Sequence, residues 1–224
     1  MDTKQTRNIL IGVVAVLLIV GGIYYSKNQK ADVVEDASNT NTELPGTGEN
    51  DTSVGVKNDE TVINQDVKNT QKFNEAMQNA QVAFGKGEYD QSIAYYNDAL
   101  SFRKSDKVYS GLFLSYSALN NVDKARVALD TAIKLNPTYV DYWKWKLSIL
   151  DDKTGVSFPD LKRVYEEGIV KVDSKTKINL ITHFAVIAEN NFQKAEAISL
   201  WEYAKQINPA KASVYQVEID RLSK

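Results

Sequence analysis

The chain has 224 residues, of which 43% are hydrophobic and 25% charged, and its formal net charge at pH 7 is −2. This composition fits one globular domain with additional segments. Because the sequence contains no cysteine, disulfides, thiol chemistry and zinc–thiolate sites are excluded. The basic residues are not clustered as they are in nucleic-acid-binding proteins, so we expect no nucleic acid partner.

The amino-terminal segment, residues 1–30, contains an uncharged run over residues 9–25. At about 1.5 Å per helical residue, this run is close to the minimum length for crossing a bilayer. Because Lys4 and Arg7 precede the run, we predict a signal-anchor helix with a cytoplasmic amino terminus. The rest of the chain would then lie outside the cytoplasmic membrane of a bacterium. The alternative is a cleaved signal peptide, although the run continues past a poor cleavage site.

The next segment, residues 31–66, is acidic and has no aromatic residues. It contains nine acidic residues and one basic residue, Lys57, which gives a net charge of −8. Such a segment buries too little apolar surface to offset the chain entropy that it would lose on folding. We therefore predict a disordered acidic linker between the membrane segment and the folded part of the chain.

The remaining residues, 67–224, contain a repeated spacing. In its clearest copy a small residue, Ala125, is followed by Leu129, Ala132 and Pro137. Residues four and seven positions apart share one helix face, so the small residues let a partner helix approach while the large residue packs into its groove. The last positions of successive copies are 33, 36 and 36 residues apart, and self-similarity at this period is typical of a helical solenoid. The other copies are Ser92, Tyr96, Ala99 and Lys104; Leu161, Tyr165, Gly168 and Asp173; and Ala197, Trp201, Ala204 and Pro209.

Glycines, asparagine pairs and prolines separate the periodic segments and mark the ends of helices. The last helix has one apolar stripe and a charged back, as a helix that caps a row of repeats requires. The expected helices cover residues 67–85, 89–103, 106–119, 122–135, 139–151, 158–172, 175–189, 192–207 and 211–223.

The small–large–small–proline spacing resembles that of the tetratricopeptide repeat family. Tyr109 and Trp143 match the family's large residue early in the first helix of a unit. The resemblance covers residues 67–224, although Lys104 stands where the family prefers proline and a long turn at residues 151–157 interrupts the third unit. It implies an all-α fold: a right-handed α-solenoid of about four helix-turn-helix repeats followed by a capping helix.

No pattern in the sequence indicates catalysis, a cofactor or a metal. His183 is the only histidine, and we identify neither a serine or cysteine nucleophile nor a second ligand for it. Asp151, Asp152 and Asp160 flank the long turn but lack the spacing of a calcium-binding loop, so we interpret them as solvated helix caps. We therefore predict no catalytic, cofactor-binding or metal-binding residue and no enzymatic activity.

In tetratricopeptide repeat proteins the first helix of each unit lines a concave groove that binds a peptide of a partner. The resemblance therefore implies a membrane-anchored scaffold that binds a protein or peptide partner. The alternative is a structural component of a cell-envelope assembly that associates with itself. The groove residues implied by register are Asn74, Met77, Gln78, Gln81, Lys107, Ser110, Gly111, Leu114, Ser117, Asp141, Lys144, Trp145 and Ser148.

Trp145 is the groove residue from which we expect the largest contribution. It lies two positions after the core-facing Trp143, and two side chains at that separation on one helix cannot both point inward. An exposed Trp145 beside Lys144 is a candidate binding hot spot. The alternative is that Trp145 covers the long turn at residues 151–157.

Overall fold

The computed structural model describes residues 59–153 and 155–224. The predicted membrane segment, residues 1–30, and the predicted linker up to residue 58 lie outside the described residues. Within the described ranges, no helix combines the length and the apolar character needed to cross a bilayer. Asp59–Lys224 forms one compact unit.

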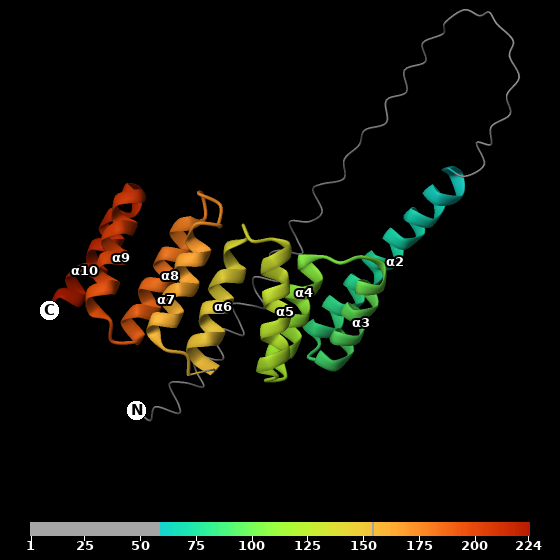
Figure 1. Cartoon of the computed structure of the whole chain (residues 1–224), viewed down its shortest axis with the longest axis horizontal. Helices are drawn as coiled ribbons and strands as arrows, with labels where there is room; N and C mark the ends of the chain where they lie inside the picture. Colours follow the sequence, from blue (N-terminus) through green and yellow to red (C-terminus); the bar gives the residue numbers. More distant parts are fainter. Residues whose placement is uncertain (1–58, 154) are drawn as a thin grey trace, which may run out of the picture. The chain divides into compact units, whose positions relative to one another are not determined.

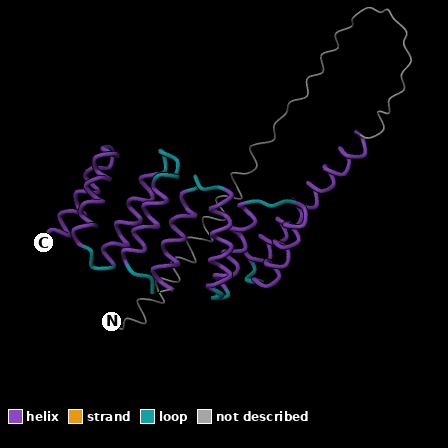
Figure 2. The backbone as a smooth tube through the Cα atoms, viewed as in Figure 1, coloured by secondary structure: helices purple, strands orange, loops and turns teal. Residues whose placement is uncertain are grey.

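The described part of the chain is built from α-helices joined by loops, with one short 3₁₀-helix (Figure 2). An all-α domain was predicted, and this prediction is confirmed. In chain order the elements are α2 (Asp59–Gly85), α3 (Tyr89–Phe102), α4 (Asp106–Ala118), α5 (Val122–Leu135), α6 (Val140–Lys153), α7 (Phe158–Ile169), α8 (Lys177–Asn190), α9 (Lys194–Ile207), η2 (Pro209–Lys211) and α10 (Ala212–Ser223).

Most helix ends lie within two or three residues of the predicted ends, but α2 is longer than expected. It begins at Asp59 rather than at residue 67, so residues 59–66, which were assigned to the linker, are helical. The sequence gives a physical reason for this extension. No glycine or proline occurs between Lys57 and Phe84, so no residue in this stretch interrupts the helix.

The helices pack in pairs, as the repeated spacing predicts. α2 packs on α3, α4 on α5 and α8 on α9, and α10 packs against α9 at the carboxy-terminal end (Figure 1). α6 contacts α5, α7 and α8, so the third pair is joined to both of its neighbours. The buried side chains of successive pairs form a single continuous hydrophobic cluster that extends from Phe73 to Ile219.

The small–large–small residues are buried in all four copies, which confirms that they face partner helices. Ser92 shows how a polar residue is accommodated at a small position: its hydroxyl donates to the Ala80 carbonyl at 2.9 Å and lies 3.1 Å from the Ser115 hydroxyl. Both hydroxyls are therefore buried with partners. The buried set consists of Ser92, Tyr96 and Ala99 in α3; Ala125, Leu129 and Ala132 in α5; Leu161, Tyr165 and Gly168 in α7; and Ala197, Trp201 and Ala204 in α9.

Three of the turns between paired helices share one backbone motif. Gly87, Asn120 and Phe192 have φ values of 81°, 57° and 59°, which is the left-handed region. In each turn the next amide donates to the carbonyl five residues before it, at 2.8–2.9 Å, and closes the end of the first helix. Glycine and asparagine adopt this conformation readily, whereas an aromatic residue is strained in it. Phe192 gains no packing in compensation, because it is 94% exposed.

We therefore expect Phe192→Gly to raise the free energy of unfolding by about 1 kcal/mol, because glycine relieves the left-handed strain. The measurement is urea denaturation of the full chain followed by circular dichroism. The matched control is Asn120→Gly at the equivalent turn, where the change should be only a few tenths of a kcal/mol since asparagine tolerates this backbone. A loss of stability in Phe192→Gly would show that the phenyl ring makes a stabilising contact.

Candidate functional site

The predicted groove residues lie on the first helices of the first three pairs, α2, α4 and α6. All of them except Gly111 are accessible, and we call this accessible set the first-helix face. Its exposed members are Asn74, Gln78, Gln81, Lys107 and Ser117. Its half-buried members are Met77, Ser110, Leu114, Asp141, Lys144, Trp145 and Ser148.

Gly111 does not line this face, which corrects the prediction. It is buried on α4 against the ring of Tyr96 from α3. A Cβ atom at this position would lie 2.1 Å from Tyr96 Cζ, so the residue must be glycine for α3 and α4 to approach this closely. The reason for the error is register: Gly111 points toward the neighbouring second helix rather than toward a partner.

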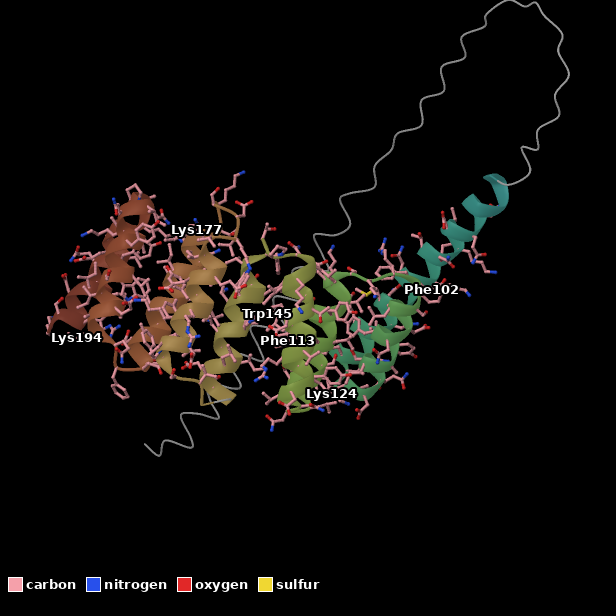
Figure 3. All side chains as sticks on the ribbon, in the orientation of Figure 1. Phe102, Phe113, Lys124, Trp145, Lys177 and Lys194 are labelled. Carbon is pink, nitrogen blue, oxygen red and sulfur yellow. The ribbon has the colours of Figure 1, made fainter. Side chains whose placement is uncertain are left out.

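Trp145 is half-buried and joins two first helices. Its indole stacks on the Phe113 ring of α4 with a centroid distance of 5.3 Å and an interplanar angle of 20° (Figure 3). It also contacts Tyr142 on its own helix, at 5.7 Å. These contacts place it at the α4–α6 seam, so Trp145 is less exposed than expected. Trp143 is fully buried, as expected, and its indole N–H donates to the Pro137 carbonyl at 2.8 Å.

A carboxylate at the start of α4 reinforces the same seam. Asp106 Oδ2 accepts hydrogen bonds from Asn136 Nδ2 at 2.9 Å and from the Tyr142 hydroxyl at 3.0 Å. Burial raises the pKa of Tyr142 well above its ordinary value, so the phenol stays protonated and keeps donating. The aromatic part of the first-helix face is therefore held in place by contacts from α4, α6 and the turn that precedes α6.

Ser148 and His183 form a contact that the sequence analysis missed. The Ser148 hydroxyl on α6 lies 3.0 Å from His183 Nε2 on α8, so His183 has a serine as a hydrogen-bonding neighbour that the sequence did not indicate. Their separation of 35 residues is close to one repeat, which places them at matching positions on neighbouring first helices. That equivalence is the signal in the sequence that could have revealed the contact.

The surroundings of His183 favour its neutral form. Burial is the main cause of its lowered pKa, and the positive charge of Lys144 adds to the effect. A hydrogen bond to the Lys144 backbone and the charges of Asp141 and Asp151 act in the opposite direction. Lys144 is itself paired with Asp141 at 2.9 Å. The polar contact between α6 and α8 therefore joins the Ser148 hydroxyl to a neutral His183 imidazole.

The lowered pKa predicts that acid destabilises the domain through His183. Below the ordinary value of 6.5, the unfolded chain binds a proton that the folded chain does not, so the stability contribution present above that value is lost as the pH falls. We expect His183→Gln, which retains hydrogen-bonding groups but does not titrate, to weaken this dependence. Urea midpoints of both chains between about pH 7.5 and pH 5.5 provide the test. Equal slopes for the two chains would contradict the expectation.

Asp151 and Asp160, which flank the long turn, contact other side chains of the same domain. Asp151 Oδ1 accepts a hydrogen bond from Asn191 Nδ2 at 2.8 Å, and Asp160 Oδ2 accepts one from the Ser157 hydroxyl at 2.6 Å. Asp160 also pairs with Arg163. Among the residues that the structure describes, no group of three or more His, Cys, Asp or Glu side chains is placed to hold a metal ion.

Two pockets lie away from the first-helix face. One, of about 390 Å³, is formed by residues of α5, α6 and the end of α7. The other, of about 340 Å³, is lined mainly by apolar side chains of α3, α4 and α5. Neither includes a predicted groove residue. Each combines residues from several helices, so its lining residues do not share one helix face in the sequence.

Comparisons with known proteins agree with the repeat architecture. Residues 77–106 and 114–139 match the family model described as Tetratricopeptide repeat. Several solved structures match the chain, among them one titled "Crystal structure of MamA". It is 18% identical, with a TM-score of 0.52, and the alignment covers 69% of this chain and 86% of that one. At this level of identity the likeness shows the fold alone. A search of curated proteins gives no match.

Proposed function

We propose that this chain, which contains tetratricopeptide repeats, is a non-catalytic scaffold that binds a protein or peptide partner on the first-helix face. Tetratricopeptide repeat domains generally act as protein–protein interaction scaffolds, and the repeats here support that class. The observation that carries the proposal is the α4–α6 seam. There the half-buried Trp145 is stacked on Phe113, with the half-buried polar residues Ser110, Lys144 and Ser148 nearby in the register.

An aromatic side chain that is already held in place loses little conformational entropy when a partner covers it. Tryptophan is also the residue type that most often dominates the energy of a protein interface. Trp145 meets both conditions, because Phe113 and Tyr142 fix its indole while part of the residue remains accessible. The polar members of the face supply hydrogen-bonding groups around this anchor.

The same geometry supports a role other than catalysis for Ser148 and His183. Both residues lie in the interior of long helices, α6 and α8. Backbone N–H groups there are already bonded within the helix, so they are not available to stabilise an oxyanion beside the serine. We interpret the pair as a polar link between neighbouring repeats.

We further propose that residues 9–25 anchor the protein in the membrane and that the repeat domain lies on the extracytoplasmic side. The uncharged run and the preceding Lys4 and Arg7 support this proposal. The acidic segment that follows would then allow the domain to reach partners at some distance from the bilayer.

Trp145→Ala tests the binding proposal. We expect about fivefold to tenfold less captured partner, as is typical for the loss of an aromatic hot spot. The measurement is cross-linking of the tagged full chain in its native membrane, followed by identification and quantification of the captured protein. Unfolding curves of the variant are needed alongside, because Trp145 also packs on Phe113.

A second pair of variants separates binding from folding. Gln78 is exposed on α2, within the first-helix face, whereas Gln91 is exposed on α3, the second helix of the same pair. Gln78→Arg should reduce capture and Gln91→Arg should not. Unchanged capture by both Trp145→Ala and Gln78→Arg would exclude the first-helix face as the binding site. Capture of a second copy of this chain alone would favour the self-associating alternative.

A further inference from the structure

The pocket formed by α5, α6 and the end of α7 is lined mainly by charged side chains, which point to a ligand of opposite charge. Three lysines, one each from α5, α6 and the turn after α7, line its volume of about 390 Å³ together with two acidic residues. We call it the lysine pocket and define it by Lys134, Lys146, Lys171, Asp130 and Glu167. None of these residues belongs to the first-helix face, so the inference does not depend on the function proposed above.

Two of the lysines, Lys146 and Lys171, are each held in position by an ion pair and by an aromatic ring. Lys146 Nζ lies 2.8 Å from Asp130 Oδ1, and Lys171 Nζ lies 2.6 Å from Glu167 Oε1. Both ammonium groups also lie near the ring of the buried Trp143, at 5.9 and 5.3 Å from its centroid. Attraction to the ring adds to the ion pairs, so the two cations are placed before any ligand arrives.

The lysine pocket has positive charge and N–H donors available to bind an anion. With three lysines and two carboxylates the pocket has one positive charge in excess, and within the described residues the exposed Lys134 forms no ion pair. Each ammonium carries three N–H donors, more than a single carboxylate contact uses. The Lys146–Asp130 pair is close but not aligned as a hydrogen bond, since Asp130 Oδ1 has no hydrogen-bond partner. The Lys146 ammonium group therefore has N–H donors available for a ligand while it stays beside Asp130.

The lowered pKa of Glu167 agrees with a positive electrostatic potential in the lysine pocket. A hydrogen bond from Lys171 is the main cause that lowers the pKa of this carboxyl; burial opposes it, and the charges of Lys171 and Lys146 each lower the pKa by less than burial raises it. The field of the two lysines thus already stabilises one carboxylate at the edge of the pocket.

We propose that the lysine pocket binds carboxylate side chains of an acidic segment in a partner protein. Ile133 and Pro137 also line the pocket, which suits the methylene groups that accompany each carboxylate in such a segment. Inorganic phosphate has no methylene groups to pack on Ile133 and Pro137, so this lining favours the carboxylate side chains of a peptide over phosphate.

The test uses a fluorescently labelled hexaglutamate peptide and the full chain in non-ionic detergent, with binding followed by fluorescence anisotropy at about 0.1 M salt. We expect Lys134→Gln to weaken binding about threefold and the charge reversal Lys134→Glu about tenfold. Lys134 is exposed and forms no ion pair within the described ranges, so we expect both variants to fold, with a small loss of stability for Lys134→Glu in the last turn of α5. The matched control is Lys194→Glu, the same charge change at an exposed position on α9, which should leave the affinity unchanged.

Four results would overturn the proposal. If Lys134→Glu bound the peptide with the same affinity as the unchanged chain, the lysine pocket would be excluded as the binding site. An equal loss in Lys194→Glu would show a response to net charge only. Displacement of the peptide by an equal concentration of inorganic phosphate would indicate a general anion site. Amide chemical shifts that change at Gln78 and Ser117 instead of Lys134 would also place the peptide on the first-helix face. In each case the cross-linking experiments on Trp145 and Gln78 would still decide the proposed function separately.

Discussion

Replacement of Trp143 by alanine is expected to lower the free energy of unfolding by about 4 kcal/mol. The indole is fully buried on α6, and its N–H donates to the Pro137 carbonyl at 2.8 Å. Gly168 of α7 lies so close that a Cβ atom there would be 2.7 Å from Trp143 Cδ2. Because the indole fills the space between these segments, its removal leaves a cavity and an unpaired carbonyl.

The measurement is chemical denaturation of the full chain, and Trp143→Phe is the matched control. Phenylalanine keeps an aromatic ring in the cavity but loses the hydrogen bond, so we expect a cost of about 1.5–2 kcal/mol. The test is whether Trp143→Ala loses more stability than Trp143→Phe. A cost below about 1 kcal/mol for Trp143→Ala would mean that the site collapses around the smaller side chain.

Gly111→Ala is expected to destabilise the domain by about 3 kcal/mol, although alanine is the better helix former. The added Cβ would lie 2.1 Å from Tyr96 Cζ and 2.5 Å from both Cε atoms of that ring. Tyr96 is only 5% exposed, so its ring has little room to move away. The clash therefore forces α3 and α4 apart. Thermal or urea unfolding of the full chain measures the cost.

Two comparisons make the Gly111 result specific. Gly85→Ala adds the same methyl group at the end of α2, where nothing lies within 4 Å of the new Cβ, and should change stability by less than about 1 kcal/mol. In a Tyr96→Leu background the clash partner is gone, so Gly111→Ala should cost about 1 kcal/mol or less. A cost that stays the same in that background would point to helix geometry instead of the contact with Tyr96.

The helices and their buried faces could be predicted from the sequence because both depend on local periodicity. The small–large–small spacing around Leu129 identifies the face that packs, and Pro137 stops the helix before it. The same reasoning failed at the start of α2. There the acidic composition of residues 59–66 suggested a linker, while the absence of glycine and proline allowed the helix to continue.

The candidate site was predicted only in part, because register places a residue on a helix face but does not give its neighbours. Trp145 was assigned to the correct helix, yet its stacking on Phe113 depends on how closely α4 and α6 approach. Gly111 was assigned to the wrong surface for the same reason. Ser148 and His183 were seen as unrelated residues although one repeat separates them.

The sequence by itself determined that residues 67–224 form paired helices, which face of each helix is buried, and where most helices end. These properties follow from the hydrophobic period and from helix-ending residues along a single stretch of chain. Only the tertiary structure decided which side chains from distant parts of the chain meet, including the Trp145–Phe113 stack and the approach of Lys171 to Trp143. The distance and angle between helices depend on the sizes of all the side chains packed between them, and no single helix carries that information.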